Sequence, residues 1–350
     1  MALFLTLAAG LWALGYFMNT PRGARWITIL LLYLAVLAVQ IAFPENHPLR
    51  LATGGSKGEW LVLGAIGVAV WGYSLVLKRL RGLTRDENRP KTDQTATSAQ
   101  VELERNARHI VLREIGGQGQ AQLKNGSVLV IGAGGLGSPV LQYLGAAGVG
   151  TIGVVDHDVV SNDNLQRQTI HTDDRIGMPK VFSAQRALEA QNPFVTVRPY
   201  NRRLTADIAT DLFSEYDLVI DGCDDPEARY VVNTACHAAQ VPLVSGALSA
   251  WEGQVTVFAT HQGTGCYQCV FPNANAPGLA PSCAEGGVLG PLPGVIGSMM
   301  AVEAIKVLTG AGDSLTGRMM IYDALYAETR TIRLSRDPAC PICGDAAKMD

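Results

Sequence analysis

A glycine-rich turn is the part of this sequence best suited to chemistry. Gly132-Ala-Gly-Gly-Leu-Gly137 follows the apolar run 128–131 and leads into a helix-like segment that starts at Ser138. Glycines let a backbone approach phosphate oxygens closely, and the next helix offers free N–H groups and the positive end of its dipole. We therefore expect a nucleotide to lie against the glycines of this turn, Gly132, Gly134, Gly135 and Gly137.

Charged side chains follow the turn at positions that suit a nucleotide. Asp156 comes at about the distance from Gly137 at which a ribose-binding acid is expected. The turn also satisfies the NAD fingerprint G-x-G-x-x-G, so the glycines do not separate NAD from ATP. Arg167 alone would be an ordinary surface cation, and Lys180 alone a helix-start lysine. Together at strand ends they favour a triphosphate.

A second acidic segment closes another apolar run. Asp221-Gly-Cys-Asp224 ends the run 218–221, which places Asp224 at the same sheet edge as the glycine turn if the strands are parallel. A carboxylate beside phosphates suits Mg²⁺, which prefers hard oxygen ligands. The alternative is a helix N-cap before Pro226, a role for which Asp225 is the better placed. Both roles stay open for Asp224.

Four of the seven cysteines form two C-x-x-C pairs. Cys266 pairs with Cys269, and Cys340 pairs with Cys343. Four thiolates suit tetrahedral Zn²⁺ with no open position, which is a structural site. The alternative is four reduced thiols or two local redox pairs. We expect zinc.

The chain beyond residue 128 alternates between strand-like and helix-like segments. This alternation predicts an α/β fold, a Rossmann-like and mostly parallel sheet with helices on both faces. The expected strands are 128–131, 151–156, 195–200 and 218–221, and the expected helices include 180–191, 226–240 and 295–308. Three later segments are more typical of hairpins, 254–258, 319–323 and 331–334.

The first 85 residues predict an all-α membrane anchor of three helices. The apolar stretches 2–18, 26–43 and 60–77 carry no internal charge, and each approaches the length that crosses a hydrocarbon core of about 30 Å. A cleaved signal peptide is the alternative for the first stretch, but it lacks a basic beginning. A polar segment, 86–104, is the expected linker to a catalytic domain over 105–350.

Loop charges predict how this anchor is oriented. Arg22 and Arg25 lie in the first loop, and a dense basic cluster follows the third stretch: Lys78, Arg79, Arg81 and Arg85. The positive-inside rule places both groups in the cytoplasm, so we expect a multi-pass protein with a cytoplasmic catalytic domain. A net charge of −3 gives no reason to expect a nucleic-acid partner.

From about Arg105 to Gly344 the sequence resembles the MoeB/ThiF/HesA adenylyltransferases, bacterial relatives of the ubiquitin-activating enzymes. The resemblance covers roughly two thirds of the chain. The matching segments are 105–109, 132–137, 147–150, 164–168, 177–180, 221–224, 253–254, 266–269, 283–285, 287–290, 294–298 and 340–343. The membrane would then be the inner membrane of a bacterium.

The resemblance implies that MgATP activates the C-terminal carboxylate of a ubiquitin-like sulfur-carrier protein that ends in Gly-Gly, of the MoaD or ThiS type. Pyrophosphate would leave, in molybdopterin, thiamine or related sulfur-transfer biosynthesis. Such an attack of one anion on another needs charge neutralisation and positioning more than a base. The implied contacts are Asp156 to ribose, Asn164, Arg167 and Lys180 to phosphates, Asp224 to magnesium, and Arg108 to the nucleotide of the neighbouring subunit in a homodimer.

Other implied features are less uniform across the family. In some relatives a cysteine at the place of Cys283, within a Gly/Pro-rich stretch, takes the carrier as a thioester or persulfide; the alternative is a neutral thiol. The sequence departs from the family at Asp225, where Asn is common, and at Asn106 and Ala107, near which a Tyr is usual. Only a short tail follows Gly344, so we expect a separate sulfur donor.

Three other functions fit parts of the sequence. An NAD-dependent oxidoreductase could use the same turn, but it gives no purpose to Arg167, Lys180 and the cysteine pairs. Another acceptor, a tRNA or a peptide or amino acid, would keep the ATP chemistry. A membrane-tethered scaffold that binds carrier without turnover would not need the cations and Asp224.

Overall fold

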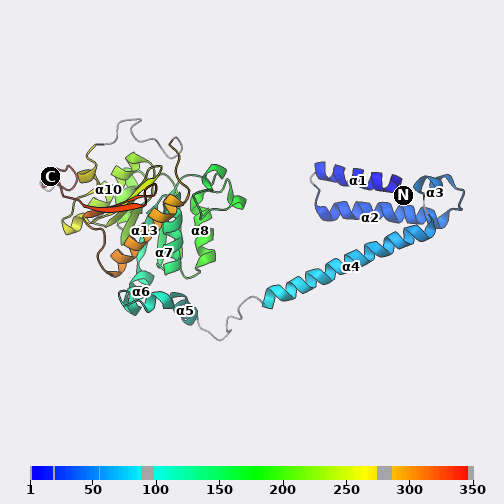
Figure 1. The fold of residues 1–350 in the computed structure, drawn as a ribbon, viewed down its shortest axis with the longest axis horizontal. Coiled ribbons are helices and arrows are strands. Elements are labelled where there is room, and N and C mark those ends of the chain that lie inside the picture. The colour runs from blue at the N-terminus through cyan, green and yellow to red at the C-terminus, as the bar shows by residue number, and fades with distance from the viewer. Residues whose placement is uncertain (1, 19, 55, 88–97, 274–285, 346–350) are drawn as a thin grey trace. The chain divides into compact units, whose positions relative to one another are not determined.

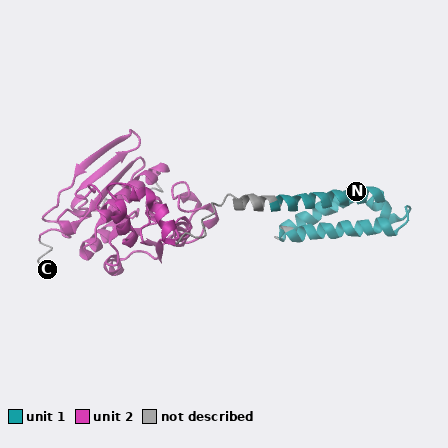
Figure 2. Cartoon of the chain, turned by 90° about the horizontal axis from the view of Figure 1, so that it is seen from below, with its two compact units in different colours: residues 1–95 teal, residues 96–350 magenta. Residues whose placement is uncertain are grey.

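The computed structural model describes the chain except residues 1, 19, 55, 88–97, 274–285 and 346–350. The chain divides into two compact units, Met1–Thr95 and Ala96–Asp350, which Figure 2 distinguishes by colour. The second unit begins with α5 (Ser98–Ile110), so residues 98–104 of the expected linker are helical.

The first unit consists of helices packed around a small aromatic cluster. They are α1 (Ala2–Phe17), α2 (Arg22–Ala42), α3 (Pro48–Thr53) and α4 (Lys57–Glu87), as Figure 1 shows. Trp60 is fully buried and packs against Phe4 and Val36. The Tyr33 hydroxyl donates a hydrogen bond to the Trp60 carbonyl oxygen (2.7 Å), which ties α2 to the first turn of α4.

Within the described residues, three helical segments are long and apolar enough to cross a membrane by length and composition: Gly23–Ala42, Lys57–Leu77 and Pro291–Thr309. The first two lie in the first unit, with 6% of each apolar window buried. With 16 residues, α1 is shorter than the roughly 20 that a span needs. The third segment is α13, of which 44% is buried inside the second unit.

The second unit is built on one eight-stranded sheet with the order β3-β2-β1-β4-β5-β6-β7-β8. Strands β1 to β5 pair in parallel and β5 to β8 pair antiparallel. Their bounds are β1 Ser127–Ile131, β2 Thr151–Asp156, β3 Thr196–Asn201, β4 Leu218–Asp221, β5 Leu243–Leu248, β6 Glu252–Phe258, β7 Arg318–Asp323 and β8 Glu328–Arg333.

Helices cover both faces of the sheet, because side chains alternate between the faces along each strand. Val128 and Val130 belong to one core cluster with α7 (Gly137–Ala147), α8 (Lys180–Gln191) and α13 (Pro291–Thr309). Leu129 and Ile131 belong to the other cluster, with α9 (Ala206–Phe213) and α10 (Pro226–Ala239). The expected Rossmann-like sheet with two helical layers is present.

Helix α13 shows why an apolar run of this length can be a core element. Leu292, Ile296, Met300 and Ala304 recur every four residues and are buried against the sheet. A Cβ atom on Gly297 would lie 2.5 Å from the Leu136 carbonyl oxygen, so only a glycine permits this close packing on α7.

Candidate nucleotide site and cysteine cluster

The glycine turn lies where the strand order reverses, between β1 and β4, which is where ligands bind in such sheets. Gly132 has φ +92°, and a Cβ atom there would lie 3.2 Å from the Gly222 carbonyl oxygen. The Gly222 N–H donates to the Ile131 carbonyl oxygen (3.0 Å). The turn after β1 and the loop after β4 are therefore in direct contact, as the parallel-strand argument predicts.

Asp156 is the last residue of β2, and its carboxylate is hydrogen-bonded to the glycine turn. One carboxylate oxygen accepts the Ala133 N–H and the other accepts the Asp158 N–H, both at 2.8 Å. These two bonds hold the carboxylate beside the glycine turn, at the edge of the sheet.

Arg167 and Asn164 lie opposite Gly135. The Arg167 guanidinium donates to the Asn164 side-chain oxygen (2.6 Å) and to the Asp163 carbonyl oxygen (3.2 Å). A Cβ atom on Gly135 would lie 3.7 Å from Cγ of Arg167. The structure thus brings an arginine, a side-chain amide and the glycine turn together.

Lys180 is the first residue of α8, and its side chain is only 6% exposed. Its ammonium group donates to the Asp158 carboxylate at 2.8 Å. Burial acts to raise the pKa of Asp158, but the hydrogen bond and charge of Lys180 outweigh it and hold this pKa below its usual value. Lys180 is thus a buried, charged group that one exposed carboxylate compensates.

His171 makes polar contacts beside the glycine turn. One ring nitrogen donates to the Ala133 carbonyl oxygen (2.8 Å), and the other lies 2.9 Å from the Ser183 hydroxyl. Burial lowers the pKa of His171 below the usual 6.5, so the ring is neutral at neutral pH. It ties the glycine turn to α8. A histidine between a turn and a helix has no sequence signature.

The loop after β4 presents Asp224 to solvent and uses Asp225 as a cap. The Asp225 carboxylate accepts the Glu227 N–H (2.9 Å) at the start of α10, which confirms Asp225 as the better-placed N-cap. Its second oxygen accepts a hydrogen bond from Arg203 (2.8 Å). Asp224 is exposed. At this departure from the family, the Asp225 carboxylate is thus engaged by the start of α10 and by Arg203.

Cys223 lies in the same loop but is not poised to react. Its Sγ–H donates to the Asp221 carboxylate at 2.7 Å. Burial and the charge of Asp221 raise the pKa of this thiol well above its usual value. The thiol therefore stays protonated.

Two predicted site residues are not assembled with the turn. Arg108 is exposed on α5, and in the described part of the chain it forms no hydrogen bond or ion pair with the turn. Cys283 lies outside the described residues. Both roles remain predictions.

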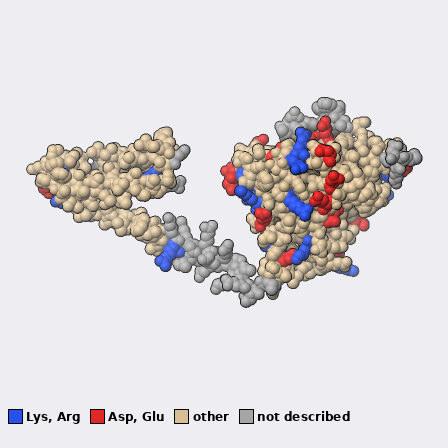
Figure 3. Space-filling model, turned by 180° about the vertical axis from the view of Figure 1, so that it is seen from behind, with Lys and Arg blue, Asp and Glu red and all other residues tan. Residues whose placement is uncertain are grey.

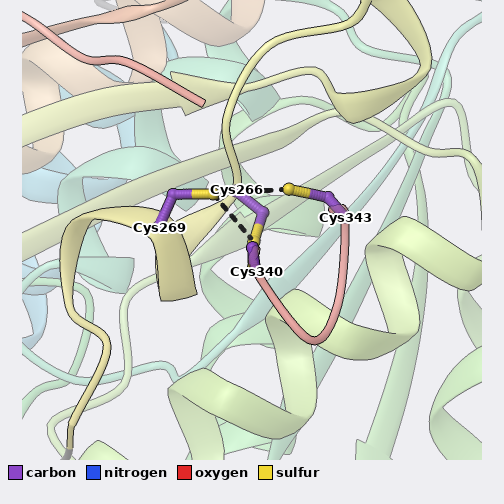
Figure 4. Close-up of side chains that lie close together, drawn as sticks. All are labelled: Cys266, Cys269, Cys340 and Cys343. Atoms are coloured by element: carbon purple, nitrogen blue, oxygen red, sulfur yellow. Dashed lines mark hydrogen bonds between the residues drawn. The ribbon is translucent and has the colours of Figure 1, made fainter. Parts of the chain in front are cut away.

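The four C-x-x-C cysteines lie together, with their sulfur atoms all within 4.8 Å of one another. Figure 4 shows the two pairs facing each other. The Sγ separations are 3.7 Å for Cys266 and Cys340 and 3.4 Å for Cys269 and Cys343. Tetrahedral Zn–S bonds of about 2.3 Å place two sulfur atoms roughly 3.8 Å apart. The cluster therefore fits zinc, and its members are too far apart for disulfides.

A model of the ThiF family matches residues 106–342. The chain belongs to the ThiF family. A sulfur carrier protein adenylyltransferase of Thermus thermophilus is 50% identical over 248 residues, which cover 70% of this chain and 92% of that protein. The probable adenylyltransferase/sulfurtransferase MoeZ of Mycobacterium tuberculosis is 46% identical over 255 residues, 72% of this chain and 65% of that relative.

The ThiF fold is also that of MccB from E. coli. A crystal structure of MccB with MccA-N7isoASN has a TM-score of 0.58 at 24% identity and covers 65% of this chain and 70% of that chain. At this identity the likeness concerns the fold. With relatives of 46–50% identity, this ThiF-family chain is an adenylyltransferase. The alternative of an NAD-dependent oxidoreductase is therefore wrong. The residues that match the ThiF family model, 106–342, all lie in the second unit.

Proposed function

We propose that this chain adenylates the C-terminal glycine carboxylate of a ubiquitin-like sulfur-carrier protein with MgATP and releases pyrophosphate. The observation that carries the proposal is the arrangement of Arg167 and Asn164 opposite Gly135 of the glycine turn, with the buried Lys180 at the start of α8. The names of the 46–50% identical relatives support the choice of a sulfur carrier. Activation of a tRNA, a peptide or an amino acid is the alternative that keeps the same ATP chemistry.

The charges of the site suit this reaction. A carboxylate attacks the α-phosphate, and negative charge builds on the pyrophosphate as it leaves. Arg167 and Lys180 would neutralise the phosphates, and Asp224 would hold the magnesium ion that shares them. Asp156 would fix the ribose. The carboxylate is already a nucleophile, so no general base is needed.

ATP–pyrophosphate exchange tests this proposal. The full chain in detergent is mixed with labelled pyrophosphate, MgATP and, in turn, each Gly-Gly-ending carrier of the same cell. We expect exchange with one carrier and none when its C-terminal glycine is removed. Exchange that needs no carrier, or that responds to a tRNA or a peptide instead, would contradict the sulfur-carrier substrate.

We further propose that the enzyme is a homodimer in which Arg108 reaches the nucleotide of the neighbouring subunit. Its exposure on α5 leaves the guanidinium accessible to a second copy.

Zinc held by the four cysteines would join the C-terminal segment to the middle of the domain. Cys283 would take the activated carrier covalently, with AMP as the leaving group, and a separate donor would supply the sulfur.

We also propose that the first unit is a membrane anchor over residues 1–85. Large apolar side chains on its helices are exposed, among them Leu31 (59%), Val68 (69%) and Trp71 (64%). Figure 3 shows this unit with few charged residues on the drawn face, whereas several groups of acidic and basic residues lie on the drawn face of the second unit. Apolar surface of this extent marks an interaction site, and the flanking basic residues favour the inner membrane with the catalytic unit in the cytoplasm.

Cell fractionation checks the anchor. We expect the full chain to sediment with bacterial membranes and to resist alkaline carbonate, because its apolar helices would otherwise face water. A chain that begins at residue 96 should stay in the supernatant, and external protease on spheroplasts should spare the catalytic unit. Recovery of the full chain in the soluble fraction would contradict the anchor.

A further inference from the structure

Arg229 holds the short segment that leads to Asp224. One guanidinium nitrogen of this α10 residue lies 3.3 Å from the Asp221 carboxylate, and another donates to the Cys223 carbonyl oxygen. The other Asp221 oxygen accepts the Cys223 N–H (3.1 Å). The start of this segment and the carbonyl just before Asp224 are therefore both fixed by one side chain.

This arrangement places a costly buried ion pair beside the site. The side chains of Arg229 and Asp221 are 9% and 1% exposed. Replacing a buried ion pair by well-packed apolar residues is often neutral or stabilising, so the pair is a poor device for stability alone. Its guanidinium fork can donate to a carboxylate and a carbonyl at the same time, which an ammonium group cannot do with the same fixed geometry.

The helix that carries Arg229 is fixed at a second point. Asn233 lies four residues later, on the same face of α10, and its side-chain oxygen accepts the Tyr267 N–H (2.8 Å) within the first C-x-x-C pair. The ring of Tyr267 also packs edge-on against Tyr230, with centroids 5.3 Å apart. The cysteine cluster thus limits movement of α10, and with it the movement of Arg229.

We infer that Arg229 is a positioning residue that sets the Asp224 carboxylate for magnesium binding. The inference rests on the proposed function, in which Asp224 is the magnesium ligand. Arg229 itself does not touch the nucleotide or the metal. It acts by fixing the Cys223 carbonyl, and Ser245 assists by donating to the same Asp221 oxygen (3.4 Å).

The test compares Arg229→Lys and Arg229→Gln with the full wild-type chain. Mutation of a residue that positions a metal ligand typically lowers metal affinity by roughly 10- to 100-fold. We therefore expect the Mg²⁺ concentration for half-maximal exchange to rise by that factor in both variants. Calorimetry should show weaker ATP binding in Mg²⁺ and unchanged ATP binding in EDTA. Zinc content should stay at the wild-type level. The exposed Arg198→Gln serves as the matched control and should change none of these values.

A lower melting temperature with wild-type Mg²⁺ dependence would show a merely structural role and overturn the inference. If neither Arg229 variant folds, Ser245→Ala is tested instead, because it removes one hydrogen bond to the same Asp221 oxygen. A small rise in the Mg²⁺ concentration for half-maximal exchange would support the inference, and no rise would overturn it. Asp224→Ala separates the two proposals. If it alters Mg²⁺ dependence and the Arg229 variants do not, this inference alone fails; if Asp224→Ala also has no effect, the proposed role of Asp224 fails with it.

Discussion

Arg167→Ala is expected to abolish ATP–pyrophosphate exchange while leaving the protein folded. The guanidinium lies opposite Gly135 and is held by Asn164 at 2.6 Å. Removal of one preorganised group that stabilises transition-state charge typically costs about 10²–10³-fold in rate. Because its partners in the structure are one side-chain amide and one carbonyl, the substitution leaves no buried charge unpaired. Exchange assays on purified protein, with melting temperature as the check on folding, measure the effect.

The control for this substitution is Arg186→Ala on α8, which removes an exposed arginine of the same domain. It should exchange at the wild-type rate. An Arg167→Ala variant that exchanges normally would remove the phosphate role of this residue, and a variant that loses ATP binding through unfolding would be recognised by its melting temperature.

Cys340→Ser is expected to release zinc and to destabilise the second unit. The sulfur atom is 3.7 Å from that of Cys266, and the residue is 2% exposed. Loss of a structural metal is among the few effects of a single substitution that lower the free energy of unfolding by on the order of 4 kcal/mol or more. Without the metal, the C-terminal segment loses its attachment to the segment around Cys266. Metal analysis and thermal unfolding measure both effects.

Cys236→Ala is the matched control, because Cys236 is equally buried (4% exposed) but lies outside the cluster. It should keep the full zinc content and lose only the small packing energy of a thiol. Cys340→Ser protein with wild-type zinc content and melting temperature would show that the four cysteines do not form the metal site.

The sequence predicted which segments meet at one edge of the sheet, because parallel strands place their carboxyl ends together. The glycine turn, Asp156 and Arg167 therefore follow from position alone. Strand β5 was missed because Ser245 and Gly246 interrupt its apolar pattern, and α9 because it has only 8 residues. The role of Arg229 could not be predicted, since no local pattern records which distant groups this side chain contacts.

The position of α13 in the chain favours its packing on the sheet over its insertion into a membrane. Its apolar window has a mean hydropathy of 1.4, below the 2.0 and 1.9 of the two segments in the first unit, but its length and composition would still suit membrane insertion during synthesis. Domains fold as units from the N-terminal side during translation. Strands β1 to β6 all precede α13 in the chain, including β4, β5 and β6 on which it packs, so its binding surface has been synthesised before the helix emerges. Placing α13 ahead of β1 would remove that advantage.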